Sequence, residues 1–212
     1  MIPPRRCVAA LACSAVLALL VGCSSTGDGR DGARSPRSDP AGSTSTTAAT
    51  ATPAAATTEA AEAVVALVVD RLRTAQHVAA AKAATGTAVD DPERERQVLA
   101  DVERLAATDE VDADYARTVF EDQIDANKDV QRALLRKWSG PTATPPAAPD
   151  LKRTVRPVLD AITPELVAAL GGLEHHRGDP GCPAAVRSAV HEAAAPAVLR
   201  RALPAATAHL CH

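Results

Sequence analysis

Two long cationic side chains share one face of the first predicted helix. Arg71 and Lys82 are 11 residues apart, which is close to three turns of an α-helix, and Ala75 and Val78 lie on the same stripe. A charge on an apolar stripe costs free energy unless an anion meets it. We therefore expect these cations to bind an anionic group, while the sequence also allows both to reach solvent at the edge of a helical bundle.

Two amide side chains lie on the apolar stripe of a later helix. Asn127 and Gln131 follow Phe120 and Ile124 at helical spacing and precede Leu134. Buried amides need hydrogen-bond partners, which either neighbouring backbone groups or a bound ligand can supply.

Further cations occur early in two other predicted helices. Guanidinium groups bind carboxylates in a bidentate manner and stay charged at any ordinary pH. Several arginines and one lysine from separate helices therefore indicate a ligand with two carboxylates. These additional cations are Arg94 and Arg96 in the second helix, and Arg153 and Arg156 in the fourth.

Apolar periodicity places all these residues on helices. Residues 59–84 repeat apolar side chains at steps of three and four, with no Pro or Gly before Gly86, which is typical of a long amphipathic helix. Asp91-Pro92 begins a second helix, and Asp112 begins a third that runs to about Trp138.

The second half continues the helical pattern. The proline-rich segment 139–149 predicts a loop, and Asp150 caps a fourth helix. We expect a kink near Thr163-Pro164 and an end at Gly171-Gly172. Two shorter helices follow, at about 183–194 and 197–210. The folded part, residues 59–212, is therefore predicted to be an all-α single-chain bundle of about six helices.

The first 58 residues have a different character. Arg5-Arg6, an apolar run over residues 8–21 and a small-residue end are typical of an export signal. Its Leu-Val-Gly-Cys ending resembles a lipobox, so Cys23 is the predicted lipid attachment site, and cleavage elsewhere as a simple signal peptide is the alternative. Residues 24–58 lack Val, Ile, Leu and aromatic residues and predict a disordered tether.

Cysteine usage and charge agree with export. Once the leader and Cys23 are set aside, Cys182 and Cys211 remain as an even pair, which predicts a disulfide. The formal net charge of −3 favours neither nucleic-acid nor polyanion binding. The membrane is therefore expected as a partner only through the lipid anchor, which would hold the protein at the outer face of the cell membrane. The alternative is a secreted or periplasmic protein without a membrane contact.

A metal site is the least favoured alternative. The candidate ligands lie in or beside a Gly-rich turn without ligand spacing, and Cys182 already has a predicted partner. These candidates are Glu174, His175, His176, Cys182 and His191.

The residues that carry charge or amide groups also resemble those of a known family. The resemblance covers residues 62–211 and includes Asp70-Arg71-Leu72, Lys82, the runs 91–96 and 119–124, and Trp138. This order is similar to that of the all-helical chorismate mutases, and the secreted branch fits best. The resemblance implies a cofactor-free Claisen rearrangement of chorismate to prephenate, with chorismate as the partner. A homodimer is compatible with it.

The resemblance also implies roles for individual residues. Lys82 and Gln131 would donate hydrogen bonds to the ether oxygen, and Arg71, Arg94 and Arg156 would bind carboxylates. In the intracellular relatives the last of these arginines comes from a partner chain, whereas the secreted branch builds its pocket within one chain. Glu95 would meet the substrate hydroxyl, and Asn127 would add a polar contact with the substrate.

Four positions depart from the family pattern. Asn127 replaces Ser or Thr, Val98 replaces a glutamine of the secreted branch, and Gln131 stands where secreted relatives often carry glutamate. Pro157 directly follows Arg156, which leaves Arg153 as the alternative third arginine.

The competing function is a non-catalytic helical lipoprotein that binds a small dicarboxylate or a protein partner.

Overall fold

The computed structural model describes residues 52–212, and the predicted leader, Cys23 and most of the predicted tether lie outside them. Within 52–212 the chain is helical and contains no strand, as predicted. The helices are α1 (Pro53–Thr85), α2 (Pro92–Thr108), α3 (Ala113–Trp138), α4 (Leu151–Thr154), α5 (Arg156–Glu174), α6 (Cys182–Glu192) and α7 (Ala197–Ala206).

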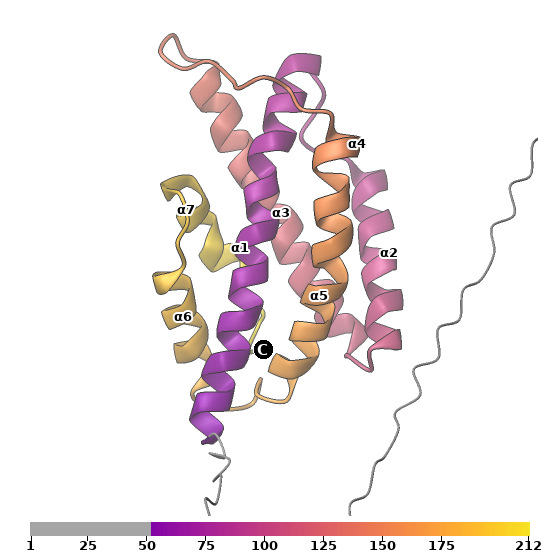
Figure 1. Cartoon of the computed structure of the whole chain (residues 1–212), viewed down its shortest axis with the longest axis vertical. Helices are drawn as coiled ribbons and strands as arrows, with labels where there is room; N and C mark the ends of the chain where they lie inside the picture. Colours follow the sequence, from indigo (N-terminus) through magenta and orange to yellow (C-terminus); the bar gives the residue numbers. More distant parts are fainter. Residues whose placement is uncertain (1–51) are drawn as a thin grey trace, which may run out of the picture. The chain divides into compact units, whose positions relative to one another are not determined.

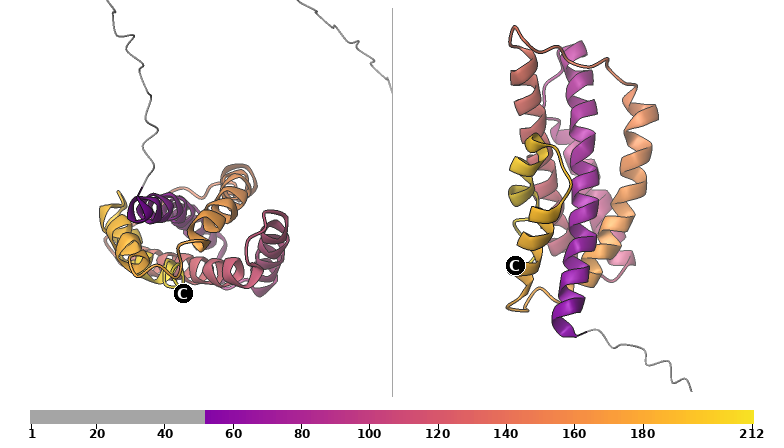
Figure 2. Two further views of the ribbon diagram at one scale, coloured as in Figure 1. Left: turned by 90° about the horizontal axis from the view of Figure 1, so that it is seen from below. Right: turned by 60° about the vertical axis from the view of Figure 1, so that its left-hand side comes forward.

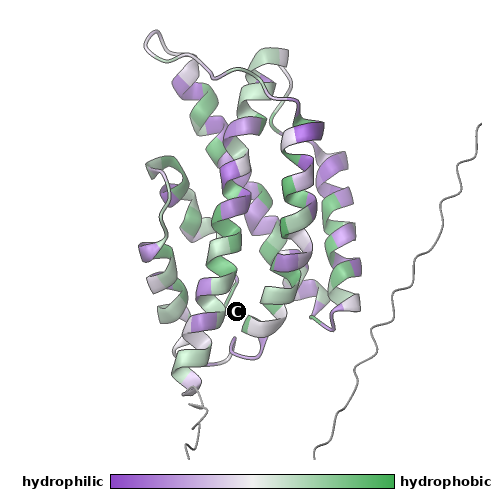
Figure 3. Cartoon of the chain, in the orientation of Figure 1, coloured by the Kyte–Doolittle hydropathy of each residue, from purple (hydrophilic) through white to green (hydrophobic). Residues whose placement is uncertain are grey.

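The bundle is organised around the pair α1 and α3 (Figure 1). Helices α6 and α7 pack on one side of this pair, while α2 and α5 pack on the other, and the end-on view of Figure 2 shows the same arrangement. Hydrophobic and hydrophilic residues alternate along each helix (Figure 3), as expected for amphipathic helices around one core. The core is aliphatic apart from the fully buried Phe120 and the nearly buried Tyr115.

Helix α1 begins at Pro53, six residues before the expected start at Glu59. Thr52 caps it, and Pro53 occupies the first turn, where a missing N–H costs nothing. Thr57 is buried, and its hydroxyl contacts His176 Nδ1 at 3.3 Å and donates to Asp179 Oδ2 at 3.0 Å. The last residues assigned to the tether therefore belong to the folded domain.

Helix α1 ends where the sequence indicated. Gly86 adopts a left-handed conformation with φ of 67°, and its N–H donates to the Lys82 carbonyl at 2.8 Å. A residue with a side chain is strained in this conformation, which explains why a glycine ends the helix here.

The fourth predicted helix differs from expectation at two points. The break lies at Val155, between α4 and α5, and α5 continues through Pro164. Pro157 agrees with this position, because it lies in the first turn of α5, where its missing N–H costs nothing. Helix α5 also runs past Gly171 to Glu174. A Cβ at Gly171 would lie 2.9 Å from a Val111 methyl group, so this glycine permits close packing and does not end the helix.

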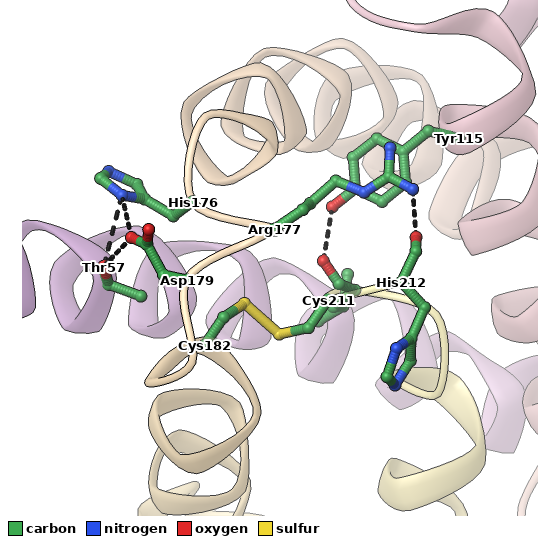
Figure 4. The surroundings of a disulfide bond; sticks show 9 residues. Thr57, Tyr115, His176, Arg177, Asp179, Cys182, Cys211 and His212 are labelled. Atoms are coloured by element: carbon green, nitrogen blue, oxygen red, sulfur yellow. Dashed lines mark hydrogen bonds and ion pairs between the residues drawn. A yellow bond between two sulfur atoms is a disulfide. The ribbon is translucent and has the colours of Figure 1, made fainter.

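The predicted disulfide is present and joins Cys182, at the start of α6, to Cys211 after α7. Figure 4 shows its surroundings. The Tyr115 hydroxyl donates to the Leu210 carbonyl at 3.0 Å, and the Arg177 guanidinium lies 4.0 Å from the Tyr115 ring centroid. The disulfide and these contacts together fix the C-terminal segment against α3.

No helix within residues 52–212 is both long enough and apolar enough to cross a bilayer. The same residues contain no group of three or more His, Cys, Asp or Glu side chains arranged to hold a metal ion.

Candidate active site

A cavity of about 560 Å³ lies among α1, α2, α3, α4 and α5, and is called the cleft below. All the substrate-site residues expected from the sequence line it, whereas Arg153, the alternative to Arg156, is exposed and lies outside the lining. Six cations and four carboxylates line the cleft, which gives it a formal charge of +2. The expected residues in the lining are Arg71, Lys82, Arg94, Glu95, Asn127, Gln131 and Arg156.

Arg71 is the most deeply buried cation of the cleft, with 8% of its surface exposed. Its Nη1 donates to Thr163 Oγ1 at 3.0 Å, and its guanidinium carbon lies 4.6 Å from the Phe120 ring centroid. Nε has no hydrogen-bond partner within residues 52–212, and no carboxylate there pairs with the guanidinium. Burial lowers the pKa of Arg71 to about 10, so the side chain is charged at neutral pH. A buried cation with these contacts suits a ligand carboxylate.

Lys82 lies three turns further along α1, on the same wall of the cleft. Its Nζ donates to the carbonyls of Ala88 at 2.8 Å and Val89 at 2.6 Å. Desolvation lowers the pKa of Lys82, although Asp91, Asp90 and Glu95 partly oppose this by stabilising the charged form. Two of the three ammonium hydrogens are committed to the loop, which leaves the third for a ligand.

The start of α2 places one cation and one carboxylate at the cleft. Asp91 accepts from the Arg94 N–H at 3.1 Å, and Pro92 occupies the first turn. The Arg94 side chain is exposed, with no ion pair or side-chain hydrogen bond inside the described part of the chain. Glu95 is partly buried and accepts from Lys128 Nζ at 3.1 Å.

Helix α3 contributes the two amides. Gln131 is 5% exposed, and its Nε2 donates to Asn127 Oδ1 at 2.8 Å. Asn127 Nδ2 in turn donates to the Arg71 carbonyl at 3.4 Å. Gln131 Oε1 is buried and has no partner among residues 52–212. The two amides therefore form a short hydrogen-bonded chain that ends at the cleft.

Lys128 also lines the cleft and is a residue that the sequence reasoning missed. Its side chain is 15% exposed and lies 3.1 Å from Glu95, 2.8 Å from Asp125 and 3.9 Å from Asp90. Desolvation opposes its charge, but hydrogen bonds to Asp125 and Glu95 outweigh that effect and raise the pKa of Lys128. Its position four residues after Ile124, on the same helical stripe, was the available signal.

Arg156 is the first residue of α5 and lines the cleft from the side opposite α3. The break at Val155 and the proline that follows set the point at which α5 begins. The cleft thus obtains one arginine from α1, two from α2 (Arg94 and Arg104) and one from α5, all within one chain. Such an arrangement can hold a small dianion and supply N–H donors to negative charge that develops between its carboxylates.

Comparison with known proteins gives a consistent result. The sequence model of the family described as Chorismate mutase type II matches residues 56–132. The secreted chorismate mutase of Mycolicibacterium smegmatis is 39% identical over 105 residues, which is 49% of this chain and 58% of that protein. The secreted chorismate mutase of Mycobacterium tuberculosis is 30% identical over 153 residues, covering 70% of this chain and 76% of that protein.

Solved structures agree with these relatives. The chorismate mutase from Burkholderia thailandensis has a TM-score of 0.69 at 36% identity, and covers 72% of this chain and 99% of its own. The enzyme from Burkholderia phymatum has a TM-score of 0.68 at 35% identity, and covers 74% of this chain and 99% of its own.

Proposed function

This chain belongs to the chorismate mutase family, and we propose that the cleft is the active site in which chorismate rearranges to prephenate. The rearrangement breaks one ether C–O bond and forms one C–C bond within a single molecule. It therefore requires neither an external electron acceptor nor a covalent intermediate. Catalysis consists of holding a dianion in a reactive conformation and stabilising the charge that builds on the ether oxygen.

Arg71 is the observation that carries this proposal. A guanidinium with 8% exposure and no carboxylate partner within 52–212 is costly in the free protein, and a substrate carboxylate would relieve that cost. Arg94 and Arg156 border the same cleft and would bind the substrate carboxylates with it. The formal charge of +2 in the lining matches a substrate with two carboxylates.

The ether oxygen is assigned to Lys82 and Gln131. Each lines the cleft and keeps an N–H that the described residues leave without an acceptor. Glu95 is assigned to the substrate hydroxyl as an acceptor, with Lys128 holding its carboxylate. None of these roles requires a cofactor.

The direct test is incubation of the purified mature protein with chorismate, with loss of chorismate followed by absorbance and the product identified as prephenate. Arg94→Ala should lower kcat/KM by a factor of about 10² or more, because a charge-assisted bidentate contact is lost. Tight binding of chorismate without turnover would instead support the non-catalytic dicarboxylate-binding protein.

We also infer that the protein is exported. The two mycobacterial relatives are named as secreted proteins, and the leader of this chain has the composition of an export signal. Attachment through Cys23 is the more specific proposal, since Leu20-Val21-Gly22 precedes this cysteine. A disulfide within the folded domain agrees with an oxidising location.

A further inference from the structure

The hydrogen bond between Asn127 and Gln131 bears on which atom of the Gln131 amide faces a ligand. The oxygen and nitrogen of a glutamine amide occupy nearly the same space, so shape alone does not decide which of them faces a ligand. The partners of the amide decide it. Gln131 Nε2 donates to Asn127 Oδ1 at 2.8 Å, and Gln131 is almost fully buried, so solvent does not compensate for a reversed amide.

Asn127 is itself oriented by the backbone of α1. Its Nδ2 donates to the Arg71 carbonyl at 3.4 Å, and a carbonyl only accepts. The same carbonyl accepts from the Thr74 hydroxyl at 2.7 Å, and its longer contact with Asn127 favours an amide that turns Nδ2 toward α1 and Oδ1 toward Gln131. Because Oδ1 also only accepts, Gln131 has to present its nitrogen. The Arg71 carbonyl of α1 thus orients the Asn127 amide, and the Asn127 amide orients that of Gln131.

This orientation has a cost that Asn127 offsets. In the observed position Gln131 Oε1 is buried without a partner among the described residues, which would favour rotation of the amide toward some other arrangement. A rotated amide would present Oε1, with its partial negative charge, to the cleft. Such a group would repel a developing negative charge, whereas the second N–H of Nε2 stabilises it.

We propose that Asn127 is a positioning residue that keeps the Gln131 nitrogen directed into the cleft. This inference rests on the proposed function of Gln131 as the donor to the ether oxygen. Each polar atom of the Asn127 amide has a partner within the protein, and the shorter of its two hydrogen bonds is the one with Gln131. In this role it does not make the direct substrate contact that the resemblance implies.

The test is a double-mutant cycle on the mature protein. Asn127→Leu should lower kcat at least ~10-fold and leave KM within about twofold, which is less than the ~10² to 10³ expected when a donor is removed outright. In a Gln131→Met background the same change should lower kcat less than about twofold, because there is no amide left to orient. Asn127→Ala, measured in parallel, separates the loss of the amide from any misfit of leucine.

Asp129→Leu is the matched control, since Asp129 lies two residues away on α3 with 71% of its side chain exposed and outside the cleft. It should leave kcat unchanged, and a loss equal to that of Asn127→Leu would overturn the proposal. A rise in KM at constant kcat for Asn127→Leu, or an equal loss in both backgrounds, would mean that Asn127 contacts substrate directly. Turnover by the unmodified protein distinguishes these failures from failure of the proposed function itself.

Discussion

Replacing Arg71 by methionine should stabilise the fold while it strongly lowers the activity. Methionine retains an unbranched, flexible side chain in the same space but removes the charge. Arg71 is buried without a carboxylate partner in residues 52–212, so in the free protein its charge is a net cost. Residues selected for binding often carry such a cost, and removing them exchanges function for stability.

The size of the stabilisation by Arg71→Met follows from the pKa of Arg71. Burial lowers the pKa of Arg71 to about 10, well below that of a free guanidinium, and at 1.36 kcal/mol per unit the difference is roughly 3 kcal/mol. Loss of the hydrogen bond to Thr163 and of the contact with Phe120 offsets about 2 kcal/mol. The net gain is about 1 kcal/mol, or a Tm higher by about 2 to 4 °C for a domain of this size.

The effect of Arg71→Met on the free energy of unfolding depends on pH in a definite direction. Because the folded-state pKa of this base lies below the unfolded value, the burial cost is fully present at neutral pH. It disappears only as the pH rises from about 10, where the folded form loses its proton, toward the unfolded value. The stabilising effect of Arg71→Met should therefore be constant from pH 6 to about 9.

Thermal unfolding followed by circular dichroism, together with a chorismate assay, checks this prediction. Arg96→Met is the control, because the Arg96 side chain is 73% exposed and its substitution should change neither Tm nor turnover. Arg71→Met should lose a factor of about 10² or more in kcat/KM. A Tm at or below that of the unmodified protein would refute the argument that Arg71 is an uncompensated buried charge.

Three further changes test other parts of the molecule. Gln131→Glu should lose activity as pH rises through the pKa of the new acid and regain it on acidification, since only the protonated acid donates a hydrogen bond. A pH–rate profile like that of the unmodified protein would show that Gln131 does not contact the ether oxygen. Replacing Cys182 and Cys211 by alanine should lower the free energy of unfolding by about 3 to 4 kcal/mol, measured in urea, and a smaller loss would show that packing alone holds the C-terminal segment. Cys23→Ser should shift the protein from the membrane fraction to the soluble fraction, and unchanged fractionation would contradict lipid attachment.

Helical periodicity predicted the helices, and it predicted which of the charged and amide side chains share a helical face. Arg71 and Lys82, and likewise Asn127 and Gln131, lie on single helical faces, so their spacing alone brings each pair to one wall. The disulfide was predictable because only Cys182 and Cys211 remain once the leader and Cys23 are set aside.

What the sequence did not predict depends on contacts between distant segments. Thr57 belongs to a stretch without branched aliphatic or aromatic residues, and its contacts with His176 and Asp179 show that residues 52–58 of this stretch are folded. Gly171 resembles a helix end until Val111 is seen to pack against it. Lys128 resembles a solvated charge, because periodicity does not reveal the carboxylates from the preceding loop and helix that surround it.

The length of α1 separates the start of the folded domain from the far end of the cleft. Lys82 lies 29 residues after Pro53 in one unbroken helix, and at ~1.5 Å per residue this is about 44 Å. Charges in solution are screened over about 8 Å at physiological ionic strength. Charged groups joined to the chain just before Pro53 should therefore leave the chemistry at Lys82 unchanged.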